Sequence, residues 1–287
     1  MVGSGNYMAS IKINAPNGTQ LHNQFAPVFQ ALKQGPISSE TEFDLSALSF
    51  LSPLTTLPLV SLIHEIGCSF KMPTNSQVSS YLDTVSFPTG ISSDFVARGM
   101  TYIPIGRLSA GDTAANERLI SEFGQLILNK LAPLPLGAAN AIHYPIGEMT
   151  TNIFDHSKKD TGWMFGQYFP KKKYLDVCIL DRGRGFRRCY EEELNLVVDD
   201  AQAVDLALRG KSSKKSDERG FGIWTTKRMI VEGLGGQCFI LSGSAGYIAM
   251  PGNEQPFTLK DVSWNGVIVA FRIPDITQPF DHTRYLE

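Results

Sequence analysis

Apolar residues recur along this chain with the period of a helix in some segments and with the period of a strand in others. The clearest helical segment covers residues 142–157, where one face is formed by Ile142, Ile146, Met149 and Ile153. Glu148, Asn152 and Asp155 follow at i, i+4 and i+7 and form a neighbouring polar face. Two carboxylates and an amide so arranged could hold a metal ion and a water, although an ordinary solvated helix face has the same pattern.

Strand and helix patterns alternate in the first third of the chain, which predicts a small α/β domain. The expected strands are residues 9–14, 42–50 and 68–72, and the expected helices are residues 20–34, 53–66 and 76–82. The segment 86–111 is rich in Ser, Gly and Pro, so we place a domain boundary near Arg107. This divides the chain into residues 1–106 and residues 107–287.

The sequence pattern of residues 107–287 predicts helices on one side of an antiparallel sheet. Such an arrangement is a two-layer α/β sandwich of the α+β class. Helices are expected at 114–131, around Glu148, at 200–209 and after Gly222. A hairpin is expected at 162–180 with its turn at 170–173, and further strands are expected at 237–241, 247–250 and 267–273.

Composition narrows the class of protein. A chain of 287 residues with 43% hydrophobic and 19% charged residues is typical of a soluble globular protein of about two domains. The net charge of -2 argues against a protein that coats nucleic acid or an anionic membrane. Ser, Thr and Pro interrupt the most apolar segment, 47–63, so no membrane span is expected. The four cysteines are widely spaced and form no C-x-x-C pair, which favours a reducing, cytoplasmic setting. The first residues do not show the pattern of a signal peptide.

Asp181 follows a mostly apolar strand, 175–180, and opens the pattern D-x-G-x-G with Gly183 and Gly185. An acidic residue at a strand end beside two glycines can meet the edge of a ligand at close backbone range. A tight surface turn that binds no ligand would show the same sequence motif. The third glycine of a dinucleotide fingerprint is missing after Gly185, so a Rossmann site is excluded.

Residues 211–219, K-S-S-K-K-S-D-E-R, form a basic segment with too few apolar residues to pack, and predict a loop. Gly220, Phe221 and Gly222 follow it at the start of a helix. Backbone N–H groups and the helix dipole favour an anion at such a position, and a polyphosphate is the natural ligand. A solvated basic loop that binds no ligand would have the same sequence pattern, and we weigh the two interpretations equally.

In chain order, E-x-x-x-N at Glu148 and Asn152, D-x-G-x-G at 181–185, and R-G-x-G at 219–222 resemble the GHKL superfamily of ATP-binding (Bergerat) domains. That superfamily contains gyrase, heat-shock chaperone ATPases, histidine kinases and anti-sigma serine kinases. The resemblance covers residues 114–274. It implies that the chain binds ATP and Mg²⁺.

The resemblance also implies roles for single residues. Asn152 would bind Mg²⁺, and Asp181 would accept a hydrogen bond from the adenine amino group, with Gly183 and Gly185 letting the backbone approach the base. The phosphates would lie against the remaining positions of the third motif and its preceding lid, which are Lys211, Ser212, Ser213, Arg219, Gly220, Phe221 and Gly222.

The branch of the superfamily stays open. Glu148 matches the glutamate that activates water in the hydrolytic members, and is the expected catalytic residue. Asp155, also expected at the nucleotide, resembles the gyrase and chaperone branch, whereas Asn152 followed by His156 resembles the anti-sigma kinases. Slow ATP hydrolysis, phosphotransfer to a protein serine and nucleotide sensing without chemistry are the alternatives, and dimers are common in the superfamily. Many members carry Gly-Thr near the last strand, and Gly266-Val267 here lacks the threonine that helps to hold the aspartate.

The run F-D-L-S-A-L-S-F-L-S-P-L-T-T-L, residues 43–57, and the segment 75–82 resemble the STAS domains, the fold of anti-sigma-factor antagonists. The resemblance implies a partner-binding module. Phosphorylatable members carry a serine at the start of the helix where this chain has Leu54, with Ser52, Thr55 and Thr56 only nearby. We therefore expect a module that binds a protein partner and is not itself switched by phosphorylation.

Overall fold

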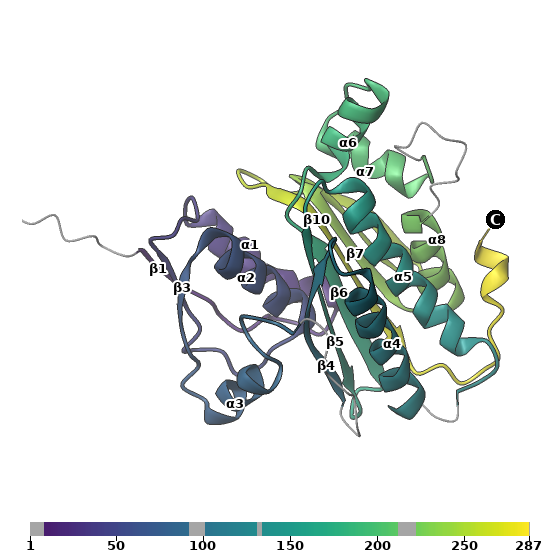
Figure 1. Cartoon of the computed structure of the whole chain (residues 1–287), viewed down its shortest axis with the longest axis horizontal. Helices are drawn as coiled ribbons and strands as arrows, with labels where there is room; N and C mark the ends of the chain where they lie inside the picture. Colours follow the sequence, from purple (N-terminus) through teal and green to yellow (C-terminus); the bar gives the residue numbers. More distant parts are fainter. Residues whose placement is uncertain (1–8, 92–100, 131–133, 212–221, 287) are drawn as a thin grey trace, which may run out of the picture.

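The computed structural model describes residues 9–91, 101–130, 134–211 and 222–286, and within α4 the side chains of residue 124 and residues 126–130 are not described. The fold is mixed α/β, as predicted. A small parallel sheet and a large antiparallel sheet lie in separate layers, with helices between and beside them (Figure 1).

The N-terminal layer, residues 9–91, is built on a three-stranded parallel sheet of order β1-β2-β3. Its elements are β1 (Ala9–Lys12), the 3-10 helix η1 (Leu21–Phe25), α1 (Ala26–Lys33), β2 (Thr41–Asp44), α2 (Pro53–Ile66), β3 (Ser69–Lys71) and α3 (Ser76–Thr84). The strand predicted at 42–50 ends early, because the Asp44 carboxylate accepts a hydrogen bond from the Ser46 amide at 2.9 Å and turns the chain. The helix predicted at 53–66 is confirmed with its bounds, and ends at Gly67 in the left-handed conformation.

The large sheet has seven antiparallel strands in the order β4-β5-β6-β10-β7-β8-β9. They are β4 (Tyr102–Ser109), β5 (Thr161–Phe169), β6 (Tyr174–Asp181), β7 (Gln237–Gly243), β8 (Ala245–Met250), β9 (Asn253–Thr258) and β10 (Trp264–Pro274). The predicted hairpin and the antiparallel arrangement are confirmed. Arg107, near the expected domain boundary, lies inside β4 and pairs with Trp163 of β5.

Helices cover one face of this sheet and the N-terminal layer covers the other (Figure 1). The helical layer contains α4 (Thr113–Lys130), α5 (Ala138–His156), α6 (Gly185–Leu194), α7 (Asp200–Leu208), α8 (Gly222–Arg228) and the π-helical turn η2 (Met229–Gly233). Consecutive side chains of β5 therefore point to opposite faces of the sheet. Trp163 and Phe165 pack in the core shared with the N-terminal layer, and Met164 packs in the core under the helical layer. Burial on both faces also explains why β6 reads as an almost continuous apolar run.

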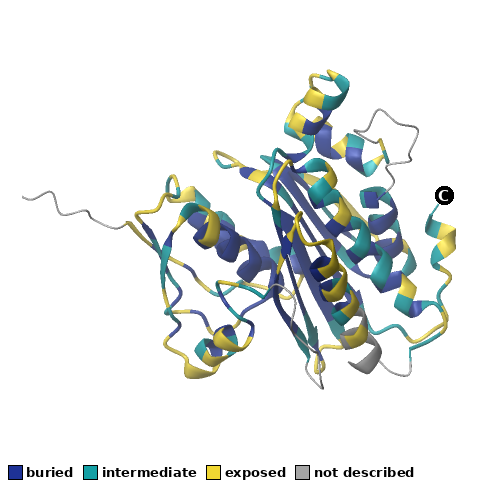
Figure 2. Cartoon of the chain, in the orientation of Figure 1, coloured by how far each residue is buried: buried dark blue, intermediate teal, exposed yellow. Residues whose placement is uncertain are grey.

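Helix α2 lies between the two sheets and packs against β5 and β6. Residues 53–63 of this helix are buried on every side, which is the burial expected of a helix that is apolar or weakly polar all round (Figure 2). Ser52, Thr55 and Thr56 are buried as well, and the Ser52 and Thr55 hydroxyl groups hydrogen-bond each other at 2.9 Å. The N-terminal layer and the large sheet therefore share one apolar core.

A buried ion pair within the large sheet is linked by a hydrogen bond to the N-terminal layer. Arg272 of β10 donates from Nε and Nη2 to the two carboxylate oxygens of Asp176 on β6, at 2.6 and 2.8 Å. Gln24 of η1 donates to the same carboxylate at 2.7 Å. Burial raises the pKa of Asp176, and the Arg272 guanidinium and Gln24 oppose that rise.

The elements that were not predicted from the sequence include β4, which lies in the segment expected to carry the domain boundary, the 3-10 helix η3 (His282–Tyr285), β9 and α6. Strand β9 is exposed over most of its length, so no alternation of apolar residues marks it. Helix α6 has only Cys189 and Tyr190 among its large buried side chains, too few for a helical period. None of the helices that the structure describes combines the length and the apolar character needed to cross a membrane.

Candidate functional site

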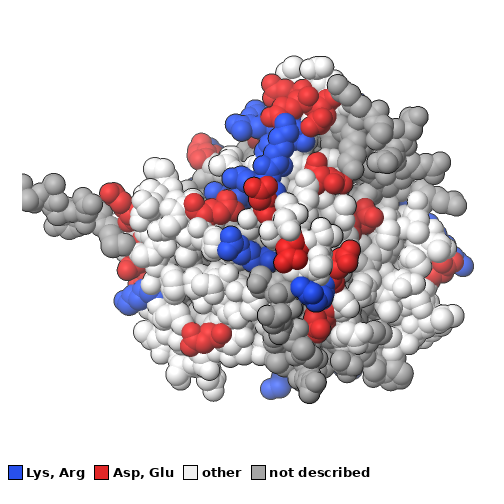
Figure 3. Space-filling view, viewed as in Figure 1, with Lys and Arg blue, Asp and Glu red and all other residues white. Residues whose placement is uncertain are grey.

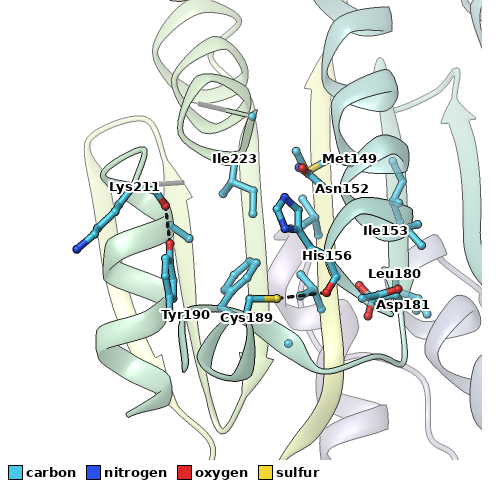
Figure 4. A pocket seen from close by; sticks show the side chains of 18 residues that line it. Met149, Asn152, Ile153, His156, Leu180, Asp181, Cys189, Tyr190, Lys211 and Ile223 are labelled. Carbon is cyan, nitrogen blue, oxygen red and sulfur yellow. Dashed lines mark hydrogen bonds between the residues drawn. The ribbon is translucent and has the colours of Figure 1, made fainter. Parts of the chain in front are cut away.

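A pocket opens on the helical side of the large sheet, between α5, the end of β6, the start of α6 and the start of α8 (Figure 4). Its walls are largely apolar and come from Met149, Ile153, Ile179, Phe186, Ile223 and Val269. Polar or charged side chains lie among them, and they include those of Asn152, His156, Asp181 and Lys211. An apolar slot with a few converging polar groups is the usual form of a small-molecule site.

Asp181 lies at the end of β6 on the floor of the pocket, and only 5% of the residue is exposed. Its Oδ1 accepts a hydrogen bond from the Gly183 amide at 2.7 Å. Burial raises the pKa of the Asp181 carboxyl to about 7, helped by the negative charge of Glu65 and opposed by the amides of Gly183 and Val267. This carboxyl consequently changes its protonation state near neutral pH.

Val267, where the resemblance leads one to expect a threonine, lies beside Asp181. Its amide opposes the rise in the pKa of the Asp181 carboxyl, and its side chain lines the pocket. Gly266 makes this approach possible, because it has a φ of 101° and a side chain on it would collide with the backbone of Asp181.

Gly183 and Gly185 have different surroundings. Gly185 lines the pocket, begins α6 with a φ of 69°, and a Cβ there would lie 2.8 Å from the Ser242 hydroxyl. A side chain on Gly183 would collide with Ser157 at the end of α5, and Gly183 lines a neighbouring pocket rather than this one. Both glycines allow the β6–α6 loop to lie against its neighbours.

Glu148, Asn152 and Gly222 meet where α5 passes the start of α8. A Cβ on Gly222 would lie 2.9 Å from Glu148 Oε2 and 3.1 Å from Asn152 Nδ2. The structure therefore brings together two motifs that are far apart in the sequence. Asn152 lines the pocket, whereas Glu148, one turn earlier on α5, does not.

Other predicted residues lie at or beyond the edge of the pocket. Asp155 is exposed and does not line it, whereas His156 does. Lys211 lines the pocket from its exposed edge, and its carbonyl accepts a hydrogen bond from the Tyr190 hydroxyl at 2.7 Å. The remaining predicted lid and phosphate residues, Ser212, Ser213, Arg219, Gly220 and Phe221, lie outside the described residues.

Helices α6 and α7 supply pocket residues that were missed at the sequence level. Phe186, Cys189 and Tyr190 come from α6 and Ala207 comes from α7. Figure 4 shows Cys189 and Tyr190 at one side of the pocket. Cys189 donates from Sγ to the His156 carbonyl at 3.3 Å. Burial raises the pKa of its thiol to about 11, so it is protonated at neutral pH and acts as a wall of the pocket rather than as a nucleophile.

The described residues contain no group of three or more His, Cys, Asp or Glu side chains that could hold a metal ion by themselves. The side-chain oxygens where α5 meets the start of α8 include those of the Asn152 amide and the Glu148 carboxylate. Such a sparse set suits Mg²⁺, which binds through one or two protein ligands when phosphates and water supply the rest.

Comparison with known proteins does not identify a family for this chain. No protein-family model matches the chain, and no curated protein matches it. A functional assignment therefore depends on the geometry of the pocket and on the three motifs that surround it.

Proposed function

We propose that the chain is a regulatory protein that binds Mg-ATP in this pocket in the manner of the GHKL superfamily. The observation that best supports the proposal is the buried Asp181 carboxyl on the floor of an apolar slot, with Asn152 and Gly222 together at another wall. The D-x-G-x-G and E-x-x-x-N motifs occupy these positions, in the order that the superfamily implies.

The adenine ring would lie between the apolar walls, where Met149, Ile153 and Phe186 exclude water from its faces. The ionised Asp181 carboxylate would accept a hydrogen bond from the adenine amino group. A guanine ring carries an oxygen at that position, and two acceptors would then face each other without a proton between them. The proposal therefore includes preference for ATP over GTP.

The phosphates would extend toward Asn152 and Gly222. Asn152 would hold Mg²⁺ through its amide oxygen, and the ion would neutralise part of the phosphate charge. Glu148 would accept a proton from the attacking water as its oxygen bonds to the γ-phosphorus and the bond to ADP breaks. Phosphotransfer would place the hydroxyl group of a protein serine where this water lies.

One observation favours a second candidate, a nucleotide-sensing module without chemistry. Glu148 lies beside Asn152 and Gly222 but does not line the pocket, so it would have to turn toward the γ-phosphate before it could act as a base. In the sensing alternative, ATP binding would change only the choice of protein partner.

The N-terminal layer is proposed to be a STAS-like, partner-binding module. Ser52, Thr55 and Thr56 are buried, which denies a kinase access to the hydroxyl groups nearest to the helix start. Cys68, Cys178, Cys189 and Cys238 are all free and buried, which suits the reducing cytoplasm proposed as the location of the protein. Assembly as a homodimer remains part of the proposal, by analogy with the superfamily.

Calorimetry with ATP and Mg²⁺, followed by single-turnover hydrolysis, tests this function. The parent protein is expected to bind ATP more tightly than GTP. Glu148→Gln is expected to keep ATP binding and to lose turnover by about 100-fold or more, because general bases contribute ~10²–10⁴-fold. Absence of ATP binding would exclude both candidates, and full turnover in Glu148→Gln would exclude the assigned base. ATP binding without measurable turnover in the parent, with and without protein partners, would leave the sensing module.

A further inference from the structure

A second pocket lies behind the nucleotide pocket, on the other side of the loop that carries Asp181. It is formed by the β6–α6 loop, the first turn of α6, the end of β7 and residues 263–266 before and within β10. Ser157 borders both pockets. The side chain of Asp181 belongs to the first pocket, whereas the next three residues of the loop, 182–184, line the second.

Positive charge dominates the second pocket. Five basic residues line it, against one carboxylate, that of Asp200; the five are Lys159, Arg182, Arg184, Arg187 and Arg188. Figure 3 shows Lys and Arg side chains gathered around the base of α6, with acidic side chains interspersed. The net charge of the whole chain is -2, so this excess of positive charge is local.

Two of the five cations are already neutralised. Arg184 forms ion pairs with Glu192 and Glu193 at 2.7 and 2.9 Å. Arg187 lies 3.4 Å from Asp200, whose carboxylate also accepts hydrogen bonds from the amide and hydroxyl of Ser244. These ion pairs hold the walls of the pocket in place. Arg184 and Arg187 therefore add little net positive charge to it.

The other three cations, Lys159, Arg182 and Arg188, form no ion pair within 4.0 Å in the described part of the chain. Glu65 of α2 interacts electrostatically with both Arg182 and Lys159 without forming an ion pair within 4.0 Å. Burial raises the pKa of Glu65, and these two cations oppose that rise. Arg188 is exposed at the mouth of the pocket.

Arg182 is held in place without a full set of hydrogen bonds. Its guanidinium lies over the indole ring of Trp264, 4.6 Å from the ring centroid. Its Nε is buried and has no hydrogen-bond partner among the described residues, and the same holds for the Trp264 indole nitrogen. A partly buried arginine with an unsatisfied donor is stabilised when an anion approaches, because the cost of desolvating its charge is then partly offset.

We propose that this second pocket binds the phosphate group of a phosphate monoester, separately from the nucleotide pocket. A phosphate dianion suits a site with two arginines and a lysine, because guanidinium groups donate paired hydrogen bonds to phosphate oxygens. The few apolar lining atoms offer no surface for a bulky apolar ligand, so recognition centres on the phosphate. The same chemistry is present in a free phosphorylated metabolite and in a phosphoserine side chain of a partner.

Titration calorimetry at constant ionic strength tests the site with three probes, inorganic phosphate, a short phosphoserine peptide and its unphosphorylated counterpart. Saturable binding of the first two and none of the third is expected. Arg188→Gln and Lys159→Gln, both at exposed positions, are each expected to weaken phosphate binding by about tenfold, the effect of losing one charge-assisted hydrogen bond. Tighter binding of the phosphopeptide than of inorganic phosphate would favour a phosphoserine side chain as the source. Equal binding would show that the peptide adds no contacts, and would favour a small phosphorylated metabolite.

Two controls separate this site from general charge and from the nucleotide pocket. Lys171→Gln removes one exposed lysine in the β5–β6 turn and is expected to leave phosphate binding unchanged. Asn152→Ala, in the nucleotide pocket, is also expected to leave it unchanged. No saturable binding at millimolar phosphate, an equal loss in Lys171→Gln, or loss in Asn152→Ala with retention in Arg188→Gln would each overturn the proposal. Because no ATP is present, failure here is distinct from failure of ATP binding.

Discussion

Strand β6 carries two buried carboxylates, Asp176 and Asp181, which face opposite sides of the large sheet. Asp176 faces the N-terminal layer and has both oxygens occupied by Arg272 and Gln24. Asp181 faces the helical layer, accepts a hydrogen bond from the Gly183 amide, and lies in a pocket with no basic side chain bonded to it among the described residues. A neutralised carboxylate joins two layers, whereas a carboxylate without a counter-ion is available to a ligand.

The largest expected effect comes from Asp176→Asn. Removing this carboxylate leaves the buried Arg272 charge without its partner, which costs about 3–5 kcal/mol of unfolding free energy. Urea denaturation monitored by fluorescence would measure the loss. The matched variant is Asp181→Asn, for which no destabilisation of this size is expected because no buried cation loses a partner. Equal destabilisation by the two substitutions would remove the distinction between the two carboxylates.

Asp181→Asn is expected to affect nucleotide binding instead. Loss of one charge-assisted hydrogen bond corresponds to about 1.5–3 kcal/mol, or roughly 10–100-fold weaker ATP binding. Calorimetry with ATP and with GTP would show whether the preference between the two nucleotides also disappears. An unchanged ATP affinity in this variant would remove Asp181 from the binding site.

The raised pKa of Asp181 also predicts a pH dependence of stability. The pKa of Asp181 is about 7 in the folded protein, above the ordinary value of 3.8, so the folded state binds its proton more tightly than the unfolded state. The contribution of Asp181 to stability is therefore greatest below pH 3.8 and falls as the pH rises from 3.8 through 7. Asp181→Asn is expected to remove this part of the dependence, which melting temperatures of parent and variant between pH 5 and 8 would reveal. Parallel curves for the two proteins would contradict the raised pKa.

The smallest effect is expected from Gly222→Ala. The added methyl group would approach Glu148 Oε2 to 2.9 Å and Asn152 Nδ2 to 3.1 Å, so both side chains must shift by a few tenths of an ångström. We expect a loss of roughly 1 kcal/mol in ATP binding, the size of a small overpacking effect. Gly147→Ala on α5 is the matched control, because nothing lies within 4 Å of its Cβ. Calorimetry with the same ATP titration would compare them, and equal behaviour would show that α8 does not pack closely on the site.

The sequence predicted those parts of the fold in which one face of an element is apolar. Helix α2, the β5–β6 hairpin and the antiparallel sheet follow from such patterns. Helix α6 did not, because its sequence is dominated by charged residues and its buried positions are too few to show a period. The docking of the N-terminal layer on the large sheet was also missed, since an apolar run in a strand does not reveal what covers its second face.

For the candidate site, the sequence selected the positions that the structure brings together, above all Asp181, Asn152 and Gly222. The sequence did not predict the pocket residues of α6. Their spacing indicates a shared helix face only when the segment is already known to be a helix. The sequence also placed Asp155 at the nucleotide, whereas the structure leaves this residue exposed outside the pocket. Spacing along one helix face cannot tell which of three polar residues a neighbouring helix will approach.

The burial of α2 between the two sheets restricts how this protein can transmit a signal. Separating the N-terminal layer from the large sheet would expose apolar side chains such as Leu54, Leu57 and Val60, which are completely buried, and would break the Asp176–Arg272–Gln24 contacts. Each such side chain costs about 1.5–3 kcal/mol to expose. Dissociation of the two layers is therefore too costly to serve as a reversible switch. Under the proposed function, communication between the nucleotide pocket and a partner on the N-terminal layer would instead travel as small displacements within an intact, rigid core.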